Sequence, residues 1–184
     1  MSDDSNKNNL IVVGVGASAG GLEALQDLIK KLPENDHVVY IIAQHMSPTH
    51  KSMMVDLLQK NSGLTVKEAT NGEQLKGRII FTTPPNKNIF VEEDRILLKT
   101  PSADSILPKP SIDLLFNSMA HSHAKNAIGI ILSGTGSDGS MGMKSIKAEG
   151  GITFVQDPQS AKYDSMPLAS INNHTVDIIS EPAG

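Results

Sequence analysis

Residues 10–25 read LIVVGVGASAGGLEAL, and this stretch decides the fold. An apolar run from Leu10 to Val15, broken only by Gly14, predicts a short strand that is buried on both faces. Small residues and glycines follow from Gly16 to Gly21. After them, apolar side chains recur at helical spacing at Leu22, Leu25, Leu28, Ile29 and Leu32. The stretch therefore predicts a buried strand, a tight glycine turn and a helix.

A serine stands at the tip of this turn, inside the pattern Gly16-x-Ser18-x-Gly20. The G-x-S-x-G pattern is typical of a nucleophile elbow, in which small neighbours let the chain bend sharply and present the serine oxygen at the carboxyl end of a strand. The N–H groups that begin the next helix would face the same point, where an oxyanion would form. The pattern favours a nucleophilic role for Ser18.

Three other interpretations of the turn compete with this one. A dinucleotide site requires an acidic residue about twenty positions on, at the end of the second strand, where the sequence has Gln44-His45. A phosphate-binding loop requires Lys and Ser or Thr after Gly21, where Leu22 and Glu23 stand. The third interpretation, a plain turn in which Ser18 caps the helix, stays open on the glycine pattern alone.

The rest of the chain alternates apolar strands with helices. Strands are predicted at 37–43, 64–69, 78–83, 127–132, 152–155 and 175–179, and helices are predicted to be capped by Thr49 or Ser52, by Ser111 and by Ser165, with another after Gly139. A hairpin is predicted from 88–92 and 95–100. This order predicts an α/β fold: a doubly wound, mainly parallel sheet with helices on both faces and one antiparallel hairpin. We expect residues 1–9 to be a disordered tail or linker remnant and residues 10–184 to be one domain.

In such a sheet, sites form beyond the carboxyl ends of the strands, which would bring Ser18, His45, Asp138 and Asp157 near one another. His45 is the best candidate base among the six histidines because it directly follows a predicted strand. For the acid that orients it, the small residues before Asp138 favour that residue, although it could also cap the following helix. Asp157, which precedes Pro158, remains the alternative.

Composition excludes several classes of function. A net charge of −4, only two arginines and 3% aromatic residues disfavour a nucleic-acid partner. No apolar run approaches the roughly 20 residues of a membrane span, so no membrane insertion is expected. Cysteine is absent, which rules out disulfides and fits a cytoplasmic location. Histidines and carboxylates show no metal-ligand spacing, and no cofactor motif stands out, so neither a metal nor a cofactor is expected.

Several separated motifs together resemble the catalytic domain of the chemotaxis protein-glutamate methylesterase family, CheB. They are VGVGASAGGLEAL at 13–25, QHM at 44–46, PPNKN at 84–88, ILSGTGSDG at 131–139 and VQDP at 155–158. The resemblance implies hydrolysis of glutamyl methyl esters on the cytoplasmic helices of chemoreceptors, with release of methanol, and glutamine deamidation as a second activity. It places the family's catalytic serine, histidine and aspartate on Ser18, His45 and Asp138.

Two departures from the family pattern bear on function. Ala19 stands where the chemotaxis enzymes usually have threonine, so a hydroxyl contact there is lost. No receiver domain precedes the motifs in this sequence. The amino-acid sequences of the glycine turns resemble those of family members fused to a CheR-type methyltransferase. Such a methyltransferase is therefore an expected partner, in the same chain or another. The rival hypothesis is a non-catalytic interaction module with the same fold.

Overall fold

The computed structural model describes residues 9–45 and 53–184. Its strands are β1 (Ile11–Ala17), β2 (Val38–Gln44), β3 (Thr65–Glu68), β4 (Ile79–Thr82), β5 (Asn88–Glu92), β6 (Arg95–Lys99), β7 (Ala127–Ile131), β8 (Ile152–Gln156) and β9 (Ile178–Ser180). Its helices are α1 (Gly21–Ile29), α2 (Met54–Gln59), α3 (Ile112–His123), α4 (Ser140–Ala148) and α5 (Ser165–Asn172), with a short 3-10 turn at Ala124–Asn126.

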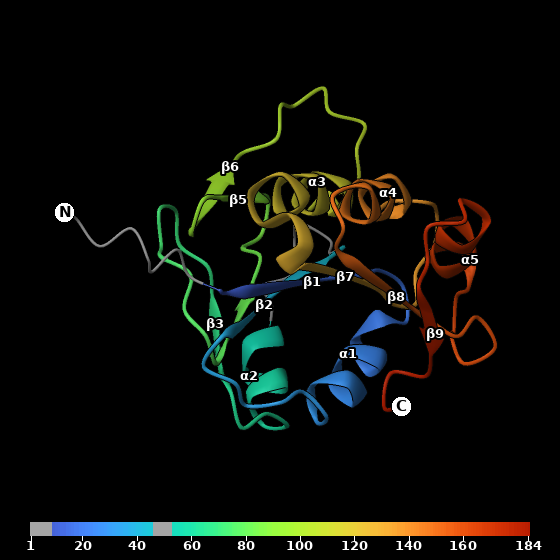
Figure 1. The fold of residues 1–184 in the computed structure, drawn as a ribbon, viewed down its shortest axis with the longest axis horizontal. Coiled ribbons are helices and arrows are strands. Elements are labelled where there is room, and N and C mark those ends of the chain that lie inside the picture. The colour runs from blue at the N-terminus through green and yellow to red at the C-terminus, as the bar shows by residue number, and fades with distance from the viewer. Residues whose placement is uncertain (1–8, 46–52) are drawn as a thin grey trace.

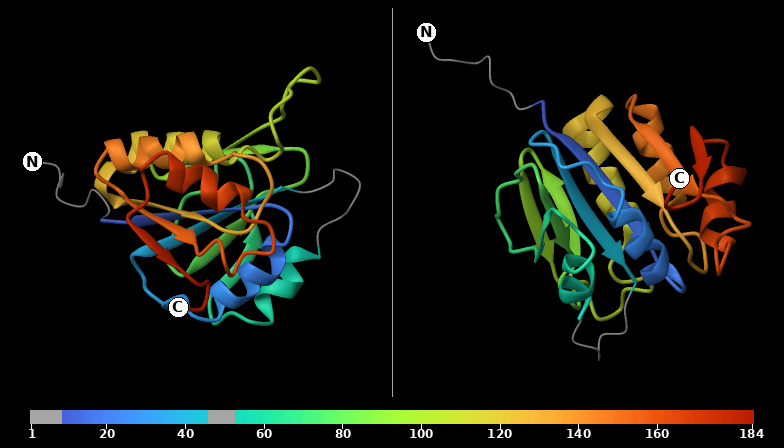
Figure 2. Two further views of the ribbon diagram at one scale, coloured as in Figure 1. Left: turned by 90° about the vertical axis from the view of Figure 1, so that its right-hand side faces the viewer. Right: turned by 90° about the horizontal axis from the view of Figure 1, so that it is seen from below.

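Seven strands form one parallel sheet in the order β3-β4-β2-β1-β7-β8-β9. The chain builds outward from β1 in one direction through β2, and later returns to the other side of β1 with β7. Helices α1 and α2 cover one face of the sheet, and α3 and α4 cover the other (Figures 1 and 2). The predicted doubly wound α/β fold is confirmed. The strand order reverses between β1 and β7, and such a switch point is where α/β sheets place their sites.

The sheet is apolar on both faces because a helical layer packs on each. On the side of α3, buried residues such as Ile41, Phe81, Phe116 and Met119 form one cluster. On the side of α1, residues such as Leu25, Tyr40 and Leu58 form a second cluster. Two-sided burial explains why the strands in the sequence are continuous apolar runs instead of alternating ones.

The predicted hairpin is present, but it forms a separate two-stranded sheet and does not extend the parallel one. Strands β5 and β6 lie beside α3 (Figure 1). Two serines of α3 bond the backbone of β5: the Val91 N–H donates to Ser118 Oγ at 2.9 Å, and Ser122 Oγ donates to Val91 O at 2.9 Å. The hairpin thus extends the layer that contains α3.

Glycines in β1 let α3 lie directly against this central strand. A Cβ at Gly16 would lie 2.5 Å from Cγ2 of Ile112, and a Cβ at Gly14 would lie 2.5 Å from the sulfur of Met119. At these separations the atoms would clash, so a Cβ at either position would force Ile112 or Met119 of α3 to shift. Gly14, which interrupts the apolar run in the sequence, is therefore a position where α3 packs against β1.

Several predicted boundaries are corrected. Strand β1 continues through Ala17, so Ser18 follows the strand at once. Ser165 is the first residue of α5 and not its cap, because Asp164 holds the N-cap position without a side-chain hydrogen bond. The last strand begins at Ile178, later than the predicted 175. The predicted caps Thr49 and Ser52 lie outside the described residues, as does the predicted tail except for Asn9.

Candidate active site

Ser18 sits between the end of β1 and the start of α1, 9% exposed. Its N–H donates to Ser133 O at 3.0 Å, and its carbonyl accepts the Gly21 N–H at 2.8 Å. The left-handed backbone conformation falls on Gly20, with φ 70°, and not on the serine. The sharp bend is thus made by a glycine two residues after the serine, and Ser18 itself carries no left-handed strain.

The Ser18 hydroxyl makes no hydrogen bond to another described residue. It lines an open groove of about 350 Å³ together with Ala19, Gly20, Leu22, Glu23, Gln44 and His45. A serine with an uncommitted hydroxyl beside a groove is accessible to a substrate. The Thr-to-Ala departure at Ala19 also falls on this groove.

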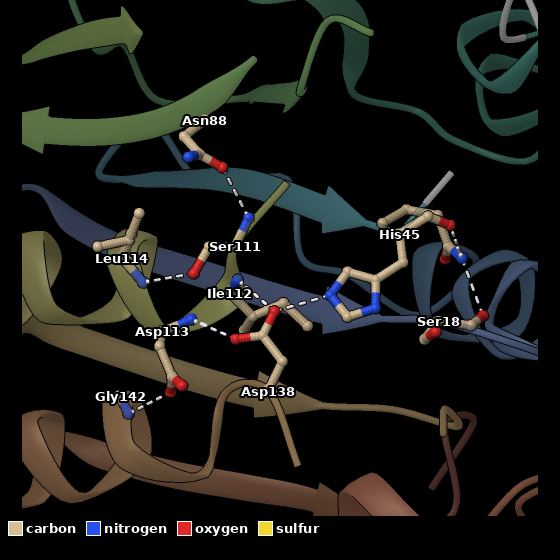
Figure 3. Close-up of polar contacts among 10 residues, drawn as sticks. Ser18, His45, Asn88, Ser111, Ile112, Asp113, Leu114, Asp138 and Gly142 are labelled. Carbon is tan, nitrogen blue, oxygen red and sulfur yellow. Dashed lines mark hydrogen bonds and ion pairs between the residues drawn. The ribbon is translucent and has the colours of Figure 1, made fainter. Parts of the chain in front are cut away.

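His45 directly follows β2, the neighbour of β1 in the sheet, and its Nε2 lies 2.7 Å from Asp138 Oδ2. The side chains are 15% and 4% exposed. Because a carboxylate only accepts, it selects the tautomer that carries the proton on Nε2, and this leaves Nδ1 as an acceptor. In Figure 3 the ring lies between Asp138 and Ser18. The structure brings the predicted base and acid together.

The Asp138 carboxylate has two further donors, both from the start of α3. The Ile112 N–H donates to Oδ2 at 2.8 Å and the Asp113 N–H donates to Oδ1 at 3.0 Å (Figure 3). The prediction that Asp138 might cap its own helix is wrong: Gly139 is the N-cap of α4, and Asp138 instead satisfies N–H groups of a different helix. Sequence spacing cannot show this contact, since it joins residues more than twenty positions apart.

These contacts decide the charge of Asp138. Burial alone would raise the pKa of this carboxyl, but the hydrogen bond from His45 and those from the Ile112 and Asp113 N–H groups outweigh burial and lower its pKa. Hydrogen bonds to the charged form of a group stabilise that form. Asp138 is therefore well suited to remain a carboxylate beside an imidazole that gains a proton.

Gln44, the last residue of β2, ties the serine turn to the histidine. Its Nε2 donates to Ser18 O at 2.8 Å and to His45 O at 3.2 Å. In the sequence, Gln44 stands at a strand end and in the QHM motif at 44–46, but it was given no role, so this role was missed; its place directly before His45 was the available signal. One amide group thus fixes the spacing between the candidate nucleophile and the candidate base.

Two N–H groups of the second glycine turn are not free to hold an oxyanion. The Gly134 N–H donates to Tyr163 O at 3.0 Å and the Ser140 N–H donates to Ser137 O at 3.1 Å, so both are committed. Helix α1 has no side-chain cap, and Leu22 and Glu23 in its first turn line the groove of Ser18. The first turn of a helix offers N–H groups and a positive dipole end, which suit an oxyanion.

Asp157 lies at the end of β8 and has a local role: its Oδ1 accepts the Gln159 N–H at 2.9 Å. No helix begins at Pro158, and the Asp157 carboxylate holds a turn. The structure brings Asp138, and not Asp157, to His45.

Within residues 9–45 and 53–184, no group of three or more His, Asp or Glu side chains is placed to hold a metal ion. None of the helices in this part of the chain is long and apolar enough to cross a membrane.

The fold is a doubly wound parallel α/β sheet, and Ser18 and the His45–Asp138 pair lie beyond the carboxyl ends of its strands, near the switch point. The order Ser, His, Asp along the chain differs from the Ser, Asp, His order of the α/β-hydrolases. The model of the CheB methylesterase family matches residues 13–184, and the chain belongs to this family.

Individual relatives agree with this placement. A putative protein-glutamate methylesterase/protein-glutamine glutaminase of Leptospira interrogans is 32% identical over 171 residues, which cover 93% of this chain and 89% of that protein. A protein-glutamate methylesterase/protein-glutamine glutaminase of Pseudoalteromonas atlantica is 35% identical over 165 residues, 87% of this chain and 44% of that protein. The chain thus spans less than half the length of that relative.

A solved structure shows the same fold. The crystal structure of the Thermotoga maritima CheB methylesterase catalytic domain superposes with a TM-score of 0.86 at 26% identity, over 95% of this chain and 94% of that chain. The fold predicted from the sequence is thus found in a solved member of the family.

Proposed function

We propose that this chain is a serine hydrolase that removes methyl esters from glutamyl side chains of chemoreceptors and deamidates glutamines by the same route. Ser18 is the nucleophile, His45 the general base and then acid, and Asp138 the residue that orients His45. The observation that carries the proposal is the 2.7 Å contact between His45 Nε2 and Asp138, which leaves Nδ1 of the ring for Ser18. Family membership and the names of the relatives support the reaction.

The reaction follows from these positions. In the proposed reaction the Ser18 hydroxyl donates to His45 Nδ1, which takes its proton as Oγ attacks the ester carbonyl carbon. N–H groups at the start of α1 stabilise the oxyanion. The proton on Nδ1 then passes to the methoxy oxygen, methanol leaves, and a glutamyl ester of Ser18 remains. Water, deprotonated by Nδ1, attacks this ester, and the proton returns to Ser18 as the glutamate departs. With glutamine, ammonia is the leaving group.

The buried charge of Asp138 contributes at the moment when His45 carries both protons. A carboxylate 2.7 Å from Nε2 stabilises the imidazolium, and the α3 amides keep the carboxylate from turning away. The base is unusual in using Nδ1 toward the nucleophile, since the chymotrypsin-type arrangement uses Nε2. The same chemistry results because either ring nitrogen can accept the proton when the other is held by an acid.

The proposal also covers the bounds of the catalytic domain, its location and the enzyme that supplies its substrate. We infer that residues 10–184 are the catalytic domain, that it works in the cytoplasm on receptor helices, and that a CheR-type methyltransferase supplies the esters it removes, in the same chain or a separate one. A methylesterase needs an enzyme that makes its substrate, and the amino-acid sequences of the glycine turns support a fused methyltransferase.

A fluorophosphonate probe tests the nucleophile directly. The wild-type protein should be labelled on Ser18, and Ser18→Ala should not be labelled. Ser133→Ala is the matched control, because Ser133 occupies the corresponding place after β7 and should not react. Methanol release from methylated receptor by the wild type completes the test. Labelling that persists in Ser18→Ala, or no labelling of the wild type, would contradict the proposal and favour a non-catalytic module.

A further inference from the structure

Helices α3 and α4 begin side by side and hold each other by reciprocal contacts. The Asp113 N–H, in the first turn of α3, donates to Asp138 Oδ1 at 3.0 Å. The Asp113 carboxylate in turn accepts the Gly142 N–H, in the first turn of α4, at 2.7 Å (Figure 3). Asp138 lies only four residues before Gly142. Asp113 therefore bonds the segment that carries Asp138 at two places, through its N–H to Asp138 and through its carboxylate to Gly142.

That segment has few other constraints on one side. Thr135, Gly136 and Ser137, just before Asp138, are exposed, and a Cβ on Gly136 would meet no atom within 4 Å. The carboxylate itself is bonded by His45 and by the Ile112 and Asp113 N–H groups, and the backbone of Asp138 leads directly into the start of α4, to which the Asp113 side chain is bonded.

The two helix starts are packed too closely to shift independently. A Cβ at Gly142 would lie 2.5 Å from Cβ of Phe116 and 3.2 Å from Cα of Asp113, so glycine is required for this approach. Burial raises the pKa of Asp113, the Gly142 N–H opposes this, and the negative charge of Asp138 raises the pKa again. A second carboxylate beside Asp138 thus has an electrostatic cost, which an apolar or neutral side chain would avoid.

We propose that Asp113 is a positioning residue for the reaction: by bonding the first turn of α4, it holds the Asp138 carboxylate at the distance and angle that His45 requires. This inference rests on the proposed function, and it adds a fourth side chain to the three that the family resemblance supplies. Asp113 touches neither Ser18 nor His45 and acts only through Asp138. Its loss should lower kcat and leave substrate binding unchanged, since the groove of Ser18 is lined by other residues.

The test compares three variants on one small methyl ester. Asp113→Ala removes the acceptor of the Gly142 N–H, and we expect kcat to fall about 10-fold with KM within about twofold, because small misplacements of a catalytic group are costly. Asp113→Asn keeps an amide oxygen for that N–H and should recover most of the lost kcat. Ser111→Ala is the matched control: Ser111 Oγ caps the same helix by accepting the Leu114 N–H at 3.2 Å and does not touch Asp138. It should lower the melting temperature and leave kcat within about twofold.

A second readout does not depend on hydrolysis. The proton on His45 Nε2 should give a downfield NMR resonance that reports its bond to Asp138. This resonance should shift in Asp113→Ala and stay in place in Ser111→Ala. If wild-type protein hydrolyses no ester, the proposed function fails, and the resonance alone decides this inference. If Asp113→Ala does not fold, Asp113→Glu replaces it; its extra methylene should displace α4 and lower kcat, whereas Asp113→Asn should not.

Two outcomes would overturn the inference. Asp113→Ala could keep the kcat and the His45 resonance of the wild type, which would show that Asp138 is positioned without it. Alternatively, Ser111→Ala could lose as much kcat as Asp113→Ala, which would show that any weakening of this helix end has the same effect and that Asp113 has only a structural role.

Discussion

Two serines occupy corresponding places at the ends of the two central strands, yet only one has a free hydroxyl among the described residues. Strands β1 and β7 pair with Gly16 opposite Ile131, so Ser18 and Ser133 follow in register, each at the start of a glycine turn. A glutamine from the next strand holds each turn: Gln44 bonds Ser18 O, and Gln156 Oε1 accepts the Ser133 N–H at 2.8 Å. The backbone framework is the same on both sides of the switch point.

The side chains have different uses. Ser133 Oγ donates to Ala19 O at 2.9 Å and accepts the Tyr163 N–H at 3.0 Å, and the residue is 1% exposed. Ser133 thus ties the two glycine turns together, whereas Ser18 faces a groove beside His45. The comparison teaches that the turn alone does not single out a nucleophile; Ser18, the proposed nucleophile, differs from Ser133 in that its hydroxyl is uncommitted next to a candidate base.

The largest expected effect comes from Ser18→Ala. Ester hydrolysis should fall by roughly 10³-fold or more, as when other serine triads lose their nucleophile. Stability should change little, because the hydroxyl bonds no other described residue. Single-turnover methanol release and thermal melting measure the two quantities. Hydrolysis at the wild-type rate would remove the distinction between the two serines.

Asp138→Asn should be the next most damaging change. An amide carries no charge to stabilise the imidazolium, and we expect kcat/KM to fall by about 10²-fold. Stability should fall too: an amide has one acceptor oxygen where the carboxylate has two, so an α3 N–H group loses its acceptor, at a cost of about 1–3 kcal/mol. The sequence alone predicts almost no stability loss here, on the wrong assumption that the residue caps α4.

Asp157→Asn is the control for that change. Its side chain accepts one N–H in an exposed turn, and asparagine does this about as well as aspartate. We expect kcat/KM within about twofold of the wild type and a stability change within the roughly 0.5 kcal/mol that is usual for surface substitutions. A severe loss here beside a near-normal Asp138→Asn would reverse the assignment of the acid.

Ser133→Ala should lower stability more than hydrolysis, the opposite of the result expected for Ser18→Ala. The Tyr163 N–H would lose its acceptor in a partly buried place, which costs at most about 1–3 kcal/mol. Hydrolysis should fall far less than in Ser18→Ala, since Ser133 does not contact His45 and does not itself line the groove, although it bonds the backbone of Ser18 and Ala19. Chemical unfolding and kcat/KM, measured at a temperature where both variants are folded, test this. A loss of activity equal to that of Ser18→Ala would make Ser133 part of the catalytic machinery.

The pH dependence of stability gives the smallest expected effect. The pKa of Asp138 is lowered in the folded state, so its contribution is complete above the unfolded value of about 3.9 and is lost as pH falls through the folded value. The difference in unfolding free energy between the wild type and Asp138→Asn should therefore shrink below about pH 4. The raised pKa of Asp113 acts in the opposite sense, so the same titration in Asp113→Asn should lose stability more steeply toward low pH. A constant difference between wild type and Asp138→Asn down to pH 2 would contradict the role of the Asp138 charge.

The sequence predicted most of the fold because the strands are continuous apolar runs separated by glycine turns and helices. It also placed Ser18 and His45 correctly at strand ends, since position at the carboxyl edge follows from the strand pattern. The contacts of Asp138 could not be predicted, because they depend on how close α3 lies to β1, and this depends on Gly14 and Gly16. In the sequence, these glycines look like parts of a turn motif or interruptions of a strand.

The long separation in sequence between His45 and Asp138 also sets when the proposed site can form during synthesis. His45 and Asp138 are separated by 93 positions. A ribosome that adds about 5–20 residues per second therefore exposes the serine and the histidine roughly 5–20 s before the aspartate. During this time the nascent chain carries a nucleophile whose base has no acid to orient it. Because α3 must dock on β1 before its amides can hold the carboxylate, the proposed site can be complete only when the second half of the sheet has formed.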